Sequence, residues 1–306
     1  MFATLISKKS GLAKLATGGM LALLIWFSIP PNSRAEESSA LNFFSFAPAA
    51  PQISKPDIKS LAPWADNMKK ARLAYSSGNF ENARVFLEKA SDEGDIVASW
   101  YLGHIHRLGR GVPADSGKAF HYYSMVAEAF TPDEPDPSRL RITIDALVRV
   151  ADMYRLGNEQ ASIKPNAKVA FRLYSTAASY GHPAANFAQG LMALKGQGVK
   201  ANPEKALKWL FLAAKKRYAP AEALLGDLYW KGEVVKADRI RGLMWYILAT
   251  QSARPEEHPE IFDRYNLLSA ELSEDQQLEA DGRARLWAEK YPLPPPPPSA
   301  WPEPQT

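Results

Sequence analysis

Small and apolar residues recur along the middle of the chain in a pattern that predicts paired helices. In residues 185–214 they occur every three or four positions in two runs, which is the period of an amphipathic α-helix. Gly196 and Gly198 separate the runs and can adopt the left-handed backbone that ends a helix. Asn202 followed by Pro203 is typical of an N-cap with proline at the first helical position. The segment is therefore predicted to be a helix-turn-helix unit.

The same pattern occurs in three other places, which predicts a repeat protein. Each copy begins with an alanine, has a second small residue five positions later and a glycine eleven positions later; the copies start at Ala98, Ala146, Ala185 and Ala221. A spacing of this size with helix-turn-helix content is typical of an α-solenoid. The predicted fold class is all-α: stacked helix-turn-helix repeats with a capping helix pair at the C-terminus.

The small residues at the fifth position are expected to lie where two helix backbones approach closely. Gly190 and Gly226 hold this position in two copies. A valine at either glycine is predicted to overpack the stack and to lower the free energy of unfolding by roughly 1–3 kcal/mol. Thermal unfolding of the two variants measures this effect.

Two stretches relate the repeats to a known family: LGRGVPADSGKAFHYY and LKGQGVKANPEKALKWL. Each has a glycine-rich turn, then Asp or Asn, then Lys-Ala three residues on. They resemble the Sel-one-like repeat, a relative of the tetratricopeptide repeat, and four copies agree in phase over residues 98–250. Residues 63–97, with SSGNFENARVFLEKA, look closer to an ordinary tetratricopeptide hairpin and are predicted to cap the start of the stack.

The first 35 residues predict export. They contain Lys8, Lys9 and Lys14 but no acid, then an apolar run over residues 18–29 and the small-x-small sequence ending at Ala35. This favours a secretory signal peptide cleaved near Ala35 and a periplasmic protein, with a retained membrane anchor as the alternative. Without this segment, basic and acidic residues balance, so a whole-molecule basic surface for nucleic acid is not expected.

The remaining segments are predicted from composition. Residues 36–62 form a flexible lead rich in Pro, Ala and Ser, whose phenylalanines could dock on the solenoid or a partner, and TPDEPDP predicts an exposed loop before Ala146. Residues 251–291 are expected to form closing helices, the second with a capping box at Ser273 and Gln276 and with Leu278 among the residues that cover the stack. Residues 292–306 predict an extended polyproline tail, a spacer or a ligand for an aromatic groove.

Catalytic chemistry is not indicated. His104 and His106 form the only close histidine pair, but two residues apart on a helix they point to different sides and cannot share a metal. His106 is expected to lie in the core. With no nucleophile or paired-carboxylate motif and no cysteine, we expect no enzyme activity, no cofactor and no metal.

A binding surface is predicted on the first helix of each repeat, on the face opposite the small repeated residues. In stacked hairpins this face lines the concave surface. This stripe is rich in aromatic and basic residues, the types enriched at interface hot spots. We define the predicted groove by these residues: Trp100, His104, Arg107, Asp152, Arg155, Phe187, Leu191, Lys195, Asp227, Trp230 and Lys231. A protein partner is expected there, although some aromatics could instead pack against the lead or the closing helices.

Further stretches resemble the ExoR-type periplasmic regulators of exopolysaccharide synthesis: AFHYYSMVAEAF, DALVRVADMYRLG and FRLYSTAASYGHPAANFAQGLMALKGQG. The resemblance implies a negative regulator that binds the periplasmic domain of a membrane sensor kinase and holds the kinase in its off state. An envelope adaptor that organises cell-wall or polysaccharide machinery is the alternative. A peptidoglycan or β-lactam hydrolase is the least favoured hypothesis.

Overall fold

The computed structural model describes residues 64–295, which form helices joined by turns and contain no β-strand. An isolated bridge between Asn158 and Ile163 is the single β-type pairing in this range. The helices are α2 (Trp64–Ser76), α3 (Phe80–Asp92), α4 (Ile96–Leu108), α5 (Ser116–Glu128), α6 (Pro137–Leu156), α7 (Ala167–Ser179), α8 (Pro183–Lys195), α9 (Pro203–Lys215), α10 (Ala219–Lys231), α11 (Arg239–Ser252), α12 (Pro259–Ala270) and α13 (Glu274–Lys290).

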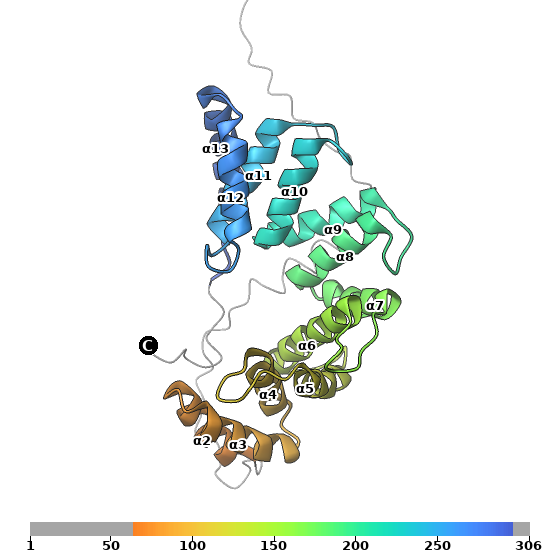
Figure 1. The fold of residues 1–306 in the computed structure, drawn as a ribbon, viewed down its shortest axis with the longest axis vertical. Helices are drawn as coiled ribbons and strands as arrows, with labels where there is room; N and C mark the ends of the chain where they lie inside the picture. The colour runs from red at the N-terminus through yellow and green to blue at the C-terminus, as the bar shows by residue number, and fades with distance from the viewer. Residues whose placement is uncertain (1–63, 296–306) are drawn as a thin grey trace, which may run out of the picture. The chain divides into compact units, whose positions relative to one another are not determined.

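The helices pack as consecutive hairpins (Figure 1). The pairs are α2 with α3, α4 with α5, α6 with α7, α8 with α9, and α10 with α11, and each pair also contacts the next one along the chain. At the C-terminal end, α12 and α13 both pack against α11. This arrangement confirms the predicted all-α solenoid with a closing helix pair.

Close helix packing explains the small residues of the repeat. The alanines that begin the four copies, Ala98, Ala146, Ala185 and Ala221, are fully buried. A Cβ atom added at Gly190 would lie 2.8 Å from the side chain of Leu210, and one at Gly226 would lie 2.6 Å from the ring of Tyr246. Both distances are too short for carbon atoms, so only glycine fits opposite these large side chains without movement.

The helix ends follow the predicted chemistry. The side chain of Asn202 accepts a hydrogen bond from the backbone N–H of Lys205, and Pro203 begins α9. Gly196 ends α8 in the left-handed conformation, with φ of +68°. The capping box of Ser273 and Gln276 is present at the start of α13. These local signals are therefore confirmed.

The loop predicted from TPDEPDP is present and mostly exposed over residues 131–136. Asp136 then caps α6 and Pro137 begins this helix, which is 20 residues long. One residue differs from the sequence-based expectation. Leu278 does not cover the stack, since its side chain is 66% exposed. Ala280 and Ala284 are the buried residues of α13 instead.

His106 lies in the interior, as expected, and its ring stacks on that of Tyr122. The predicted signal peptide (1–35), the lead (36–62) and residues 296–306 of the tail lie outside the described residues. Residues 292–295 of the tail are exposed and not helical.

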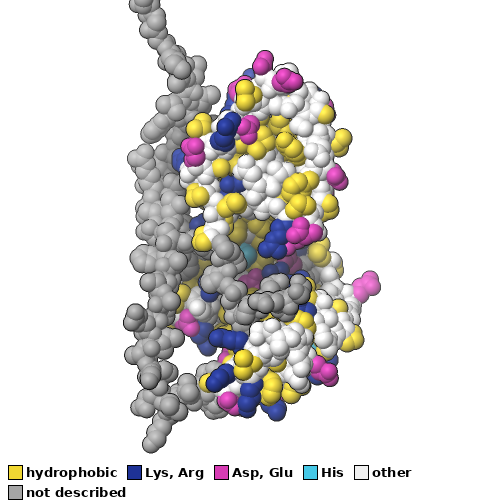
Figure 2. All heavy atoms as spheres, turned by 90° about the vertical axis from the view of Figure 1, so that its left-hand side faces the viewer, with side chains coloured by type: hydrophobic (Ala, Val, Ile, Leu, Met, Phe, Trp, Pro, Cys, Tyr) yellow, Lys and Arg dark blue, Asp and Glu magenta, His cyan; other side chains and the backbone are white. Residues whose placement is uncertain are grey.

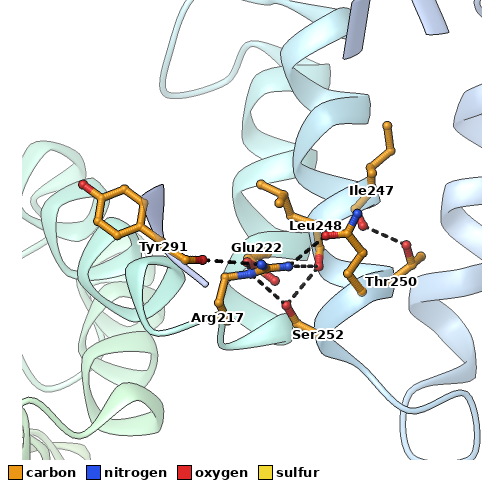
Figure 3. Close-up of polar contacts among 8 residues, drawn as sticks. Arg217, Glu222, Ile247, Leu248, Thr250, Ser252 and Tyr291 are labelled. Atoms are coloured by element: carbon orange, nitrogen blue, oxygen red, sulfur yellow. Dashed lines mark hydrogen bonds and ion pairs between the residues drawn. The ribbon is translucent and has the colours of Figure 1, made fainter. Parts of the chain in front are cut away.

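A buried ion pair joins Arg217, in the turn between α9 and α10, to Glu222 of α10 (Figure 3). Arg217 Nε lies 2.8 Å from Glu222 Oε1, and the two side chains are 2% and 0% exposed. Arg217 also donates to the carbonyl oxygen of Leu248 and to the side chains of Gln251 and Ser252 on α11. We call Arg217, Glu222 and these acceptors the closed network.

Candidate functional site

Two neighbouring hollows lie along the first helices of the repeats, and Leu191 lines both. The first hollow has a volume of about 360 Å³ and the second about 300 Å³. Figure 2 shows a face of the molecule on which hydrophobic, basic, acidic and histidine side chains meet in a depression. The first hollow is lined by Asp145, Val148, Arg149, Asp152, Arg155, His182, Pro183, Ala184, Phe187, Ala188, Leu191 and Tyr218.

Helix α6 supplies the charged side of the first hollow. Asp145, Arg149 and Asp152 are spaced by four and three residues, so they lie on one face of the helix. The apolar side comes from α8, through Phe187 and Leu191 among others. The hollow therefore has a charged wall and an apolar wall, contributed by two successive repeats.

Asp145 is held by residues of two helices. Its Oδ2 accepts a hydrogen bond of 2.8 Å from Nε1 of Trp100 on α4, and its Oδ1 accepts one of 3.2 Å from Nη2 of Arg149. His104 Nε2 lies 3.8 Å away and its ring packs edge-on against Trp100. Burial alone would raise the pKa of Asp145, but its contacts with His104, Arg149 and Trp100 hold that pKa well below its usual range. Asp145 is thus ionised at neutral pH.

Asp152 and Arg155 share a tyrosine from the neighbouring helix. Tyr174 on α7 donates its hydroxyl proton to Asp152 Oδ1 at 2.6 Å and accepts a hydrogen bond of 3.2 Å from Arg155 Nε. Arg155 Nη2 lies 3.8 Å from Asp152 Oδ1, which is an ion pair rather than a hydrogen bond. Burial, aided by the Asp152 charge, raises the pKa of Tyr174, so the hydroxyl stays protonated.

His182 and Tyr218 enter the first hollow from the N-cap positions of α8 and α10. Neither side chain makes a capping hydrogen bond. The Nδ1 atom of His182 is buried and has no hydrogen-bond partner among the described residues, and burial lowers the pKa of the imidazole. The ring of Tyr218 packs against that of Phe187 with 5.6 Å between centroids. Two helix starts therefore complete the hollow.

The second hollow combines apolar and charged residues of α8 and α10. Leu191, Lys195, Asp227 and Lys231 line it together with residues of the following turns. Asp227 Oδ1 lies 3.6 Å from Nε of Arg264 on α12, so the closing helices contribute to its charge balance. This hollow continues the surface of the first one toward the C-terminal end.

Seven of the eleven residues of the predicted groove line the hollows: Asp152, Arg155, Phe187, Leu191, Lys195, Asp227 and Lys231. Trp100 and His104 lie behind the first hollow, where they contact Asp145. Arg107 is exposed and lines neither hollow. Trp230 packs within its own hairpin, against Gly242 and under the guanidinium group of Arg239 at 5.2 Å.

Eight of the twelve lining residues of the first hollow were missing from the predicted groove. Those with charged, polar or aromatic side chains are Asp145, Arg149, His182 and Tyr218. Asp145 directly precedes the first alanine of its repeat, a position on the outer face, so the helical pattern could have identified it. His182 and Tyr218 occupy the N-cap position that Asp95 holds at the start of α4. A histidine or an aromatic residue at an N-cap departs from the usual residue types, and the prediction did not use this signal.

Residues 64–295 contain neither a metal cluster nor a membrane span. This range contains no cluster of three or more His, Asp or Glu side chains placed to hold a metal ion. Within the same range, none of the helices combines the length and the apolar character needed to cross a bilayer.

The fold is an α-solenoid with two hollows along the first helices of its repeats. The Sel1 repeat model matches residues 72–95, 96–129, 144–182, 183–218 and 219–252, more than half of the chain. The chain therefore belongs to the Sel1 repeat family. The first match falls inside the segment predicted as a tetratricopeptide-like cap.

Relatives with assigned functions are similar over part of the chain. An exopolysaccharide production negative regulator of Rhizobium leguminosarum bv. viciae and one of Rhizobium meliloti are each 29% identical over 133 residues, 43% of this chain and 49% of theirs. The chain thus spans about half the length of these curated relatives. The crystal structure of a Sel1 repeat protein from Oxalobacter formigenes is 22% identical, with a TM-score of 0.54 and coverage of 85% of this chain and 96% of that chain, which supports the fold.

Proposed function

We propose that this protein is a non-enzymatic, periplasmic negative regulator that binds the extracytoplasmic domain of a sensor histidine kinase controlling exopolysaccharide or envelope genes. The hollows carry the proposal, because they place partly exposed basic, acidic and aromatic side chains along successive repeats. Mixed surfaces of this kind, with Arg and aromatic anchors, are typical of protein interfaces. The two rhizobial relatives are named as negative regulators of exopolysaccharide production, which supports the proposal that this protein lowers exopolysaccharide output.

Deleting the gene and measuring exopolysaccharide tests the regulatory part. Loss of a negative regulator raises exopolysaccharide output, and the wild-type gene restores the lower level. An unchanged or reduced output in the deletion strain would contradict the proposal.

Charge reversal tests whether the hollow is the contact surface. Arg155→Glu alters the first hollow, and Arg172→Glu is the matched control on the exposed face of α7. The purified extracytoplasmic domain of the kinase should bind the wild type and the control but not Arg155→Glu, as measured by titration calorimetry. Equal binding by all three proteins would place the contact elsewhere.

A further inference from the structure

The acids and the arginines of the first hollow differ in how fully the protein itself uses them. Asp145 accepts hydrogen bonds from Trp100 and Arg149, and Asp152 accepts one from Tyr174. Both carboxylates therefore already have partners inside the protein. The side chain of Asp145 is 18% exposed, whereas that of Asp152 is 41% exposed and is more open to water than either arginine.

The arginines keep donors that no protein group uses. A guanidinium group carries five N–H donors and no acceptor. Arg149 directs Nε and Nη2 to Asp145, and Arg155 directs Nε to Tyr174. Among residues 64–295, Nη1 of Arg149 and both Nη atoms of Arg155 make no hydrogen bond to a protein acceptor. The hollow has balanced formal charge but a surplus of donors.

His182 adds to this surplus. Its buried Nδ1 has no partner, and a neutral imidazole can present that nitrogen as a donor when the proton is placed there. An unpaired polar atom in a buried place costs free energy unless a ligand or water supplies a partner. A ligand rich in acceptor oxygens would satisfy all three side chains.

The apolar wall of the first hollow favours an apolar group of the ligand. Pro183, Phe187, Ala188 and Leu191 of α8 line it, and the ring of Tyr218 lies beside Phe187. This wall would leave a sugar's hydroxyl groups without partners, which is unfavourable. It can bury an aliphatic or aromatic side chain of a polypeptide.

We propose that the first hollow recognises an acidic side chain next to a large apolar side chain in a peptide segment of the protein partner. The carboxylate lies between the guanidinium groups of Arg149 and Arg155, a pairing that planar guanidinium groups make with two parallel hydrogen bonds. The apolar neighbour packs on Phe187 and Leu191. This inference rests on the proposed function, because it names the chemistry of the partner's contact segment.

A random peptide library displayed on phage tests the inference on the full-length protein. Selection on the wild type should enrich Asp or Glu beside Leu, Ile, Phe or Met, and Arg155→Gln should not retain these peptides. The matched control, Arg172→Gln on α7, should retain them. Enrichment without an acidic residue, equal retention by Arg155→Gln, or no enrichment at all would overturn the inference.

The best selected peptide then gives a quantitative measurement. Its affinity, from fluorescence anisotropy, should fall at least about tenfold when its acid is changed to the matching amide, the difference expected for losing one charged hydrogen-bonded contact. Displacement of the peptide by a glucuronic acid oligosaccharide at equal or lower concentration would show that the site takes a saccharide, and would overturn the inference. Thermal melts of Arg149→Gln and Arg155→Gln show whether each variant is folded.

The outcomes separate the inference from the proposed function. If the kinase domain binds the wild type but the peptides lack an acidic residue, the inference is wrong and the proposed function stands. If acidic peptides bind the hollow but no kinase domain does, the site chemistry is right and the proposed partner is wrong.

Discussion

The closed network around Arg217 and the charged wall of the first hollow use the same residue types in different ways. Arg217 and Glu222 are almost entirely buried, and the guanidinium group has acceptors on α10 and α11. Arg149 and Arg155 are paired only in part, with side chains 34% and 26% exposed. Each guanidinium nitrogen of Arg217 has an acceptor inside the protein, although Glu222 Oε2 is buried without a hydrogen-bond partner among the described residues. Arg149 and Arg155 keep unused donors, which can accept a ligand.

Burial of the closed network also determines how much stability is lost when one of its side chains is removed. Desolvation makes a buried ion pair costly to form, and removing one partner leaves an uncompensated polar group inside the protein. The charged groups of the first hollow lose less of their hydration, since water reaches the guanidinium groups. We therefore expect variants of the closed network to affect stability most, and variants of the hollow to affect binding most.

Arg217→Met is expected to have the largest effect on stability. It leaves the carboxylate of Glu222 without its partner, and such losses cost roughly 3–5 kcal/mol. Chemical denaturation measures the change. A double variant, Arg217→Met with Glu222→Leu, should recover much of the lost stability, and a single variant as stable as the wild type would contradict the assignment of this pair.

Asp145→Asn is expected to have an intermediate effect. The amide keeps the shape of the side chain but loses the charged acceptor for Trp100 and Arg149, which is worth roughly 1.5–3 kcal/mol. Denaturant unfolding gives the free energy difference. An unchanged value would mean that Asp145 does not hold α4 and α6 together.

The closed network should also give the stability a pH dependence. Burial raises the pKa of Glu222 to about 7, above the ordinary value of 4.5. Between these values the native state binds more protons than the unfolded chain, so this contribution to stability is full below about pH 4.5 and is lost as pH rises through about 7. The melting temperature of the wild type should fall relative to that of Glu222→Gln as pH rises from about 4.5 to about 8. Parallel curves would contradict the shift.

Arg155→Gln is expected to change stability least among the network variants. Its ion pair with Asp152 is long and partly exposed, and such pairs contribute about 1 kcal/mol or less. Binding of the kinase domain should nevertheless weaken strongly. Arg254→Gln, in the exposed pair with Glu257, is the control that should change neither stability nor binding.

The repeat pattern predicted the fold because its signals are local. Helix caps, glycine turns and the small residues at fixed positions each depend on residues close in sequence, and the stack follows from repeating them. The contacts of Arg217 with α11 were not predicted, because these partners lie more than thirty residues away. Nothing in the pattern of one hairpin indicates which side chains of the next will meet it.

The helical pattern was less informative at the edges of the predicted groove. Trp230 is nine positions after the first alanine of its repeat, about 180° around the helix and beside the row that faces the second helix. Gly242 leaves space there, so the indole packs inside the hairpin. His182 and Tyr218 precede their helices, and angular periodicity does not apply to N-cap residues.

The account depends most on a polypeptide binding in the first hollow, and site-specific photocrosslinking tests this directly. A benzophenone amino acid replaces Phe187 in the hollow or, as the control, Leu212, which is exposed on α9. With the kinase extracytoplasmic domain present, the probe at position 187 should form a crosslinked product and the probe at position 212 should not. A product from position 212 alone, or equal products from both positions, would contradict the central claim.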